Sequence, residues 1–205
     1  MNNINIEINK EEVLRYMGTR SAAEPNIVSM VDKYILESAG YLAPRYALRE
    51  FNIIRDENDR IFIDKVSLDG TDIAHFLKDS YKCYLMCATI GYEIEREIDK
   101  AATKSTLIEL IIESIGSAAV ENLCDKVQAS IDKNLARFSP GYGDFPLDIQ
   151  PAIIKLLNAA KLIGVSVSDM MLLTPRKSVT AIIAHNKSCK LSKCKACDKE
   201  CAFRK

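Results

Sequence analysis

Hydrophobic and polar positions in the first third of the chain repeat with two different periods, which predict both strands and helices. Apolar residues at every second position predict a strand, and apolar residues three and four apart predict a helix. On this basis the sequence predicts a strand-like start at residues 4–6 and two helices at 10–17 and 25–40. It also predicts a β-hairpin whose strands are residues 45–54 and 60–66.

The middle of the chain combines an almost fully apolar segment with a long helical pattern. Residues 82–90 are mostly apolar, as expected of a central strand, and a charged helix follows at 92–102. Thr106 and Glu109 have the spacing of a capping box for the next helix. That helical pattern is long and leads into a loop that begins at Arg137.

Beyond this loop the pattern returns to short elements. Asp148 has the position of an N-cap for a further helix, and residues 165–173 and 178–184 alternate as strands around the turn at Thr174 and Pro175. Several strands with helices between and after them are typical of an α+β fold.

Composition and charge are those of one ordinary globular domain. The chain has 205 residues, of which 48% are hydrophobic and 27% are charged. Its formal net charge is zero, so no overall charge attracts it to nucleic acid or acidic membranes. The first residues lack the pattern of a signal peptide, and the apolar stretch 107–120 is interrupted by Glu109 and Glu113, unlike a membrane span. We therefore expect a cytoplasmic protein with neither nucleic acid nor a membrane as its partner.

The loop from Arg137 to Pro146 contains two prolines and two glycines, which make it rigid and give it unusual backbone angles. A Pro-Gly turn between two helices would explain these residues. A binding loop would explain them too, because the guanidinium of Arg137 matches a carboxylate and Tyr142 offers a flat face and a hydroxyl. The residues alone leave both interpretations open.

Arg137, Pro140, Gly141 and Tyr142 form the pattern Arg-x-x-Pro-Gly-Tyr, which resembles the S-adenosylmethionine-binding motif of the activation domain of cobalamin-dependent methionine synthase. Two further segments, 118–125 and 175–180, resemble the same family, and His185 closes the second. The likeness covers roughly residues 85–186, and the loop also resembles that of short, free-standing relatives of the domain. This resemblance implies a twisted antiparallel sheet with helices packed around it, within one domain at 1–186.

The resemblance also implies which residues bind S-adenosylmethionine, namely Glu121, Arg137, Pro140, Gly141 and Tyr142. Arg137 would hold the carboxylate of the ligand, and a carboxylate of the chain would attract its ammonium and sulfonium. Glu121 and Asp125 lie four residues apart and so share one helix face, where they could equally be two solvated side chains. The family has an acidic residue at the position of Glu121, which favours Glu121.

In functional terms, the resemblance implies a reactivation protein for a cobalamin-dependent methionine synthase that lacks its own activation domain. S-adenosylmethionine would remethylate the cobalamin of that partner after a one-electron reduction, with a flavodoxin or ferredoxin-type protein as a possible donor. The chain itself then needs no catalytic residue, and whether it counts as an enzyme stays open. Another corrinoid methyltransferase could be the partner instead.

The C-terminal segment 187–205 contains four of the seven cysteines, in the order Cys189-x4-Cys194-x2-Cys197-x3-Cys201. This spacing predicts a metal site, favouring an iron–sulfur cluster, with zinc as the alternative. A small iron–sulfur or zinc protein that serves as an electron carrier or scaffold is therefore the alternative function. The segment also departs from the synthase domain, since Cys189 follows Ser188 where the family has a Ser-x-Tyr-Tyr segment. The far wall of the binding pocket is thus not predicted.

Overall fold

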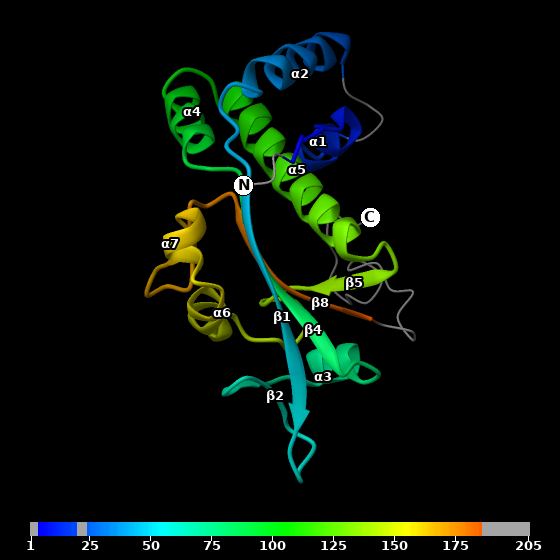
Figure 1. The fold of residues 1–205 in the computed structure, drawn as a ribbon. Coiled ribbons are helices and arrows are strands. Elements are labelled where there is room, and N and C mark those ends of the chain that lie inside the picture. Colours follow the sequence, from blue (N-terminus) through cyan, green and yellow to red (C-terminus); the bar gives the residue numbers. More distant parts are fainter. Residues whose placement is uncertain (1–3, 20–23, 186–205) are drawn as a thin grey trace.

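The computed structural model describes residues 4–19 and 24–185 (Figure 1). Its centre is a six-stranded antiparallel sheet in the order β3-β2-β1-β4-β8-β5. Helices cover both faces, so the α+β prediction is confirmed. The strands are β1 (Arg45–Arg55), β2 (Ile61–Ile63), β3 (Val66–Leu68), β4 (Lys82–Thr89), β5 (Leu135–Phe138) and β8 (Ser178–His185).

Strand β4 lies in the middle of this sheet because its sequence is apolar on both faces. Cys83, Leu85 and Cys87 point into one apolar cluster, whereas Met86 and Ala88 point into a second cluster on the opposite face. Successive side chains of a strand alternate between the two faces of a sheet, and a strand buried on both reads as a continuous apolar run. The expected central strand is therefore confirmed.

Three helices cover the first face of the sheet, and two cover the second (Figure 1). The first face packs against α3 (Thr71–Leu77), α6 (Gln150–Leu157) and α7 (Ala159–Ile163). The second packs against α4 (Glu93–Ala102) and the long α5 (Thr106–Ile131). Helices α1 (Lys10–Tyr16) and α2 (Pro25–Ser38) lie against α5 and form a third apolar cluster with it.

The small residues of α5 allow this close packing. Ala118 lies in the cluster with α1 and α2, together with Ile111 and Ile115. Ala119 points into the cluster between α5 and the sheet. The helix is thus buried on two sides, whereas Glu121 is only partly buried and Asp125 is exposed.

Three predictions of secondary structure, two of strands and one of a helix end, were wrong wholly or in part. Residues 4–6 form no strand, and Ile4 and Ile6 pack instead against the cluster beneath α5. The long helix does not reach the loop, because it ends at Ile131 and the edge strand β5 follows. Residues 165–173 form not one strand but two short ones, β6 (Ser166–Val167) and β7 (Leu173–Thr174), because a turn at 168–172 separates them.

Two predicted helix caps were also wrong. The cap of α5 is Ser105, whose hydroxyl accepts a hydrogen bond from the backbone N–H of Ile108 at 3.4 Å, so Thr106 is the first helical residue. Asp148 lies inside a short 3-10 turn at 147–149 and caps no helix. Both errors are shifts of one or two residues, the usual uncertainty of helix ends.

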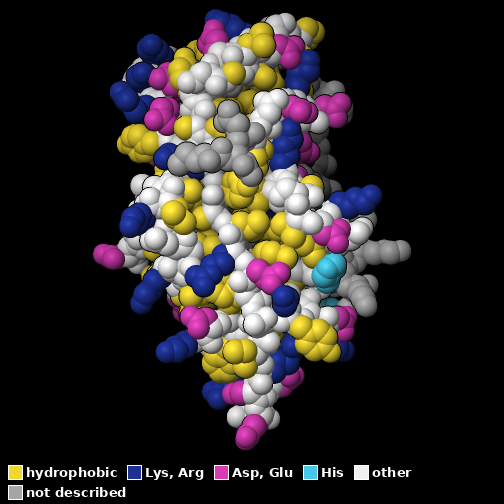
Figure 2. All heavy atoms as spheres, in the orientation of Figure 1, with side chains coloured by type: hydrophobic (Ala, Val, Ile, Leu, Met, Phe, Trp, Pro, Cys, Tyr) yellow, Lys and Arg dark blue, Asp and Glu magenta, His cyan; other side chains and the backbone are white. Residues whose placement is uncertain are grey.

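Basic and acidic side chains are interspersed over the face seen in Figure 2, in keeping with the formal net charge of zero. Within residues 4–19 and 24–185, no helix is both long and apolar enough to cross a membrane.

Candidate functional site

The loop from Arg137 to Pro146 is fixed to the core by aromatic side chains at both of its ends. Phe138, the last residue of β5, stacks on Phe76 of α3 with ring centroids 5.4 Å apart. Phe145 is 1% exposed and lies 6.1 Å from the ring of Phe138. Because Phe145 is buried and Phe138 is partly buried against the same cluster, both ends of the loop are attached to the core.

The two glycines of this loop are required by its backbone. Gly141 and Gly143 have positive φ angles of 87° and 55°, which cost side-chain-bearing residues energy. The N–H of Gly141 donates to the carbonyl of Phe145 at 2.8 Å and closes the turn. A Cβ atom at Gly143 would collide with the carboxylate of Asp72, so Gly143 lets the loop approach α3.

Asp144 ties the loop to the N-terminus of α3. Its carboxylate accepts hydrogen bonds from the backbone N–H and the hydroxyl of Thr71, both at 2.6 Å, and from the N–H of Asp72 at 2.9 Å. The N–H of Asp144 donates back to Asp72 Oδ2 at 3.1 Å. The pKa of Asp144 is lowered by these bonds, chiefly by that from the Thr71 hydroxyl. This carboxylate caps a helix whose own N-cap, Gly70, has no side chain.

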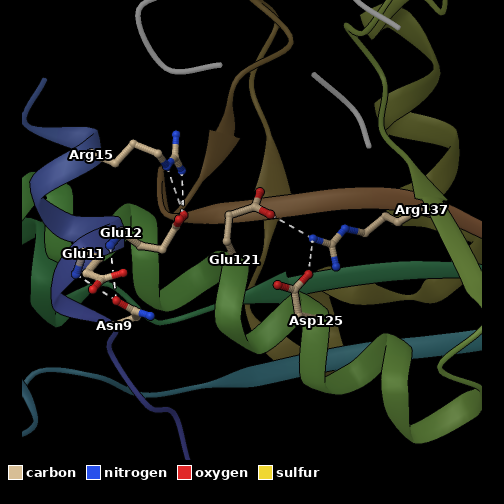
Figure 3. A network of polar contacts seen from close by, with 7 residues as sticks. All are labelled: Asn9, Glu11, Glu12, Arg15, Glu121, Asp125 and Arg137. Carbon is tan, nitrogen blue, oxygen red and sulfur yellow. Dashed lines mark hydrogen bonds and ion pairs between the residues drawn. The ribbon is translucent and has the colours of Figure 1, made fainter. Parts of the chain in front are cut away.

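Arg137 leads from β5 toward α5, where two carboxylates hold it (Figure 3). Its Nη2 donates to Glu121 Oε2 and to Asp125 Oδ1, each at 2.8 Å, and its side chain is 3% exposed. Burial by itself lowers the pKa of Arg137, but Cys124, Glu121 and Asp125 more than offset this and raise it above its usual value. The guanidinium is therefore charged at any physiological pH.

Helix α1 borders Glu121 on another side (Figure 3). Burial raises the pKa of Tyr16 at the end of α1, and the nearby Glu121 carboxylate raises it further. Arg15, next to it, pairs with Glu12 at 2.8 Å. Glu121 of α5 thus lies between α1 and Arg137, the first residue of the loop.

A pocket opens beside Glu121, where the loop, α5 and β8 meet. Its cavity has a volume of about 170 Å³. The side chain of Ser139 is buried, and its hydroxyl has no hydrogen-bond partner among the described residues. The residues that line the pocket are Glu121, Ser139, Pro140, Tyr142, Gln150, Leu173, Ser178, Val179 and Thr180.

Polar contacts fix the wall opposite the loop. Gln150, at the start of α6, accepts a hydrogen bond from the hydroxyl of Thr180 at 3.0 Å and donates to the carbonyl of Met171 at 2.6 Å. The hydroxyl of Ser178 donates to that of Thr89 at 2.9 Å. This wall therefore combines residues of α6, β8 and the turn after β6.

The segment that leads into β8 is held by two buried charges. Glu95 of α4 accepts hydrogen bonds from the backbone N–H groups of Arg176 and Lys177. The ammonium of Lys177 reaches across α5 to Glu113 and Ser117. The aliphatic part of the Lys177 side chain lies over Gly116, where a Cβ atom would come within 3.3 Å of three Lys177 carbons. Gly116 thus makes room for this side chain.

Of the five residues expected to bind the ligand, Glu121, Pro140 and Tyr142 line the pocket. Arg137 and Gly141 do not, although Arg137 contacts Glu121 and Gly141 shapes the loop. Sequence analysis assigned no binding role to the other lining residues. A signal existed for Ser178 to Thr180, which lie in the second segment that resembles the family, whereas Gln150 and Leu173 had none.

The predicted metal ligands Cys189, Cys194, Cys197 and Cys201 lie outside the described residues, so the metal site stays a prediction. In the part of the chain that the structure describes, no three His, Cys, Asp or Glu side chains form a group that could hold a metal ion. The cysteines at 83, 87 and 124 are buried, and burial raises the pKa of Cys83 and Cys87 to about 12.

A solved structure shares this arrangement of sheet and helices. It is described as the MetH reactivation domain bound to AdoHcy, and it superposes with a TM-score of 0.67 over 90% of this chain and 76% of that chain, at 15% sequence identity. The chain has the fold of a MetH reactivation domain. Because the match covers 90% of the chain, it extends well beyond residues 85–186 and includes much of the N-terminal half. No protein-family model matches the sequence, and neither does any curated protein.

Proposed function

We propose that this protein binds S-adenosylmethionine in the pocket beside Glu121 and supports the reductive remethylation of cobalamin on a partner methionine synthase that lacks its own activation domain. The observation that carries the proposal is this pocket, formed by the Arg-x-x-Pro-Gly-Tyr loop within the fold of a MetH reactivation domain. That domain was bound to AdoHcy, the product that remains when S-adenosylmethionine gives up its methyl group.

The residues that line the pocket suit the parts of such a ligand. Glu121 places a carboxylate where an ammonium or sulfonium would be attracted, and its side chain is 26% exposed, so the attraction is only partly screened. Tyr142 is 44% exposed and offers its ring to a flat base. The hydroxyl of Ser139 provides a donor and an acceptor for a ribose, and those of Ser178 and Thr180, whose hydrogens bond Thr89 and Gln150, provide acceptors.

In this proposal the chain contributes binding and orientation. S-adenosylmethionine supplies the methyl group, and the reduced cobalamin of the partner accepts it. Pro140 and Gly141 keep the loop rigid, Glu121 and Arg137 hold the amino-acid end of the ligand, and Tyr142 holds the base. Such positioning lowers the barrier by removing the entropy cost of bringing donor and acceptor together.

Calorimetry with S-adenosylmethionine and S-adenosylhomocysteine tests the binding step. We expect one site per chain for both compounds, and competition between them. A reactivation assay then tests the function, because added protein should restore activity to a methionine synthase whose cobalt is in the inactive cobalt(II) state. Failure to bind either compound would refute the proposal. Binding without reactivation would favour another corrinoid methyltransferase as the partner.

We further propose that Cys189, Cys194, Cys197 and Cys201 hold an iron–sulfur cluster that receives an electron from a flavodoxin or ferredoxin-type donor, with zinc as the alternative metal. Their spacing supports this proposal. Protein purified without air should be brown, and its absorbance should bleach on reduction. A colourless protein with one zinc would favour a structural site. If that protein also failed to bind S-adenosylmethionine, a metal-binding scaffold would be the better description.

A further inference from the structure

Arg137 is a buried charge in contact with Glu121, which lines the pocket, and its hydrogen bonding is incomplete. Its Nη2 donates to both Glu121 and Asp125, and its Nη1 lies 3.5 Å from Gln128 Oε1. Its Nε is buried and has no hydrogen-bond partner within residues 4–19 and 24–185. Nε and Nη2 form one edge of a guanidinium, the edge that a carboxylate binds with both of its oxygens. Only half of that edge is in use here.

Glu121 and Asp125 differ in how firmly they are held. The side chain of Asp125 is 63% exposed, whereas that of Glu121 is 26% exposed and lines the pocket. An exposed carboxylate returns to water at little cost, since an exposed ion pair contributes little free energy. Asp125 is therefore the partner that Arg137 releases more easily.

We infer that Asp125 is a stand-in for the carboxylate of the ligand, and that the ligand displaces it from Arg137 on binding. This inference rests on the proposed function and deepens it. A ligand carboxylate that binds the Nε–Nη2 edge gives the buried Nε an acceptor, which the described part of the chain does not provide. Glu121 contacts Arg137 and lines the pocket, so the guanidinium lies only one side chain away from the ligand.

Two consequences follow for ligand recognition. Asp125 lowers the affinity for every ligand that must displace it, because the ligand carboxylate has to compete with an intramolecular one. A nucleoside without a carboxylate leaves the Arg137–Asp125 pair intact. The pair therefore weakens the binding of nucleosides that carry an amino-acid group and leaves the binding of those that have lost it unchanged, so it reduces the preference of the site for the former.

The test compares two ligands on variants of the full chain. S-adenosylhomocysteine carries the carboxylate, and 5′-methylthioadenosine lacks it. Asp125→Asn should bind S-adenosylhomocysteine about two- to fivefold more tightly than the wild type, the factor expected when one exposed ionic competitor is removed. Its affinity for 5′-methylthioadenosine should not change. Glu109→Gln is the control, because it removes one negative charge from the same helix outside the site, and it should alter neither affinity.

Asp125→Ala is the second variant, since an asparagine keeps one acceptor for Arg137, and circular dichroism establishes that both variants are folded. Equal or weaker binding of S-adenosylhomocysteine by both variants would overturn the inference and leave the proposed function standing. Tighter binding of both ligands would also overturn it, because the effect would then not depend on the carboxylate. A wild type that binds neither ligand would overturn the inference together with the proposed function.

Discussion

Arg137 contributes to both the structure and the proposed site, and its substitution tests its role in binding. Arg137→Ala should weaken the binding of S-adenosylmethionine by about 1.5–3 kcal/mol, the range for hydrogen bonds to a charged group. Calorimetry measures this loss directly. Arg60→Ala removes an equally charged but exposed arginine that pairs with Asp56 on the β1–β2 turn, and it should bind like the wild type. Equal affinities of Arg137→Ala and the wild type would contradict the assignment of this residue.

Gly143 gives a second test at the scale of the residue, this time of stability. Gly143→Ala should destabilise the protein in two ways, because a left-handed φ costs about 1–2 kcal/mol and the lost Asp72–Asp144 hydrogen bond about 0.5–1.5 kcal/mol. Gly18→Ala is the matched control. Its φ is also positive, at 78°, but among the described residues a Cβ there meets nothing within 4 Å. Urea denaturation should show the smaller loss for Gly18→Ala, and equal losses would mean that the close approach to Asp72 is unimportant.

At the scale of the element, Asp144 makes the attachment of α3 depend on pH. Folding lowers the pKa of this carboxyl, so its stabilising effect is fully present above the unfolded pKa of about 4. The effect is lost as the pH falls through the lower, folded pKa. Asp144→Asn should therefore be less stable than the wild type at neutral pH, and the difference should shrink below about pH 4.

Urea denaturation at several pH values measures this difference. Asp148→Asn is the control, because Asp148 lies in the 3-10 turn that follows the loop and caps no helix. It should stay close to the wild type at every pH. A constant difference between Asp144→Asn and the wild type, from neutral to acid pH, would show that the charge of Asp144 is not what attaches α3.

The sequence could predict those elements in which apolar and polar residues follow the buried and exposed faces over several consecutive positions. Strand β4 is apolar on both faces, and α2 has one apolar face, so both were identified. Strand β5 has four residues and a mixed pattern, in which the buried charge of Arg137 takes the place of an apolar side chain. Its position at the edge of the sheet depends on pairing with β8, which is remote in sequence. No local pattern contains that information.

At the scale of the whole molecule, the candidate site joins segments that are far apart in the chain. Helix α5 contributes Glu121, the loop contributes Tyr142, and β8 contributes Thr180. The motif led to the loop because its prolines and glycines are adjacent in sequence. Gln150 could not be found in this way, since its importance comes from hydrogen bonds to Thr180 and Met171 that exist only in the folded chain.

The described part of the chain contains all three apolar clusters, so it should fold without the cysteine-rich segment. A chain cut after Asn186 should keep its circular dichroism and its affinity for S-adenosylmethionine. If the cysteines carry electrons, this truncated chain should fail to reactivate a cobalt(II) synthase when a protein reductant is supplied. It should succeed with a strong chemical reductant, as the full chain should with both. If the truncated chain is unfolded, the metal has a structural role instead. If it reactivates the synthase equally well with both reductants, the cysteines have no role in electron transfer.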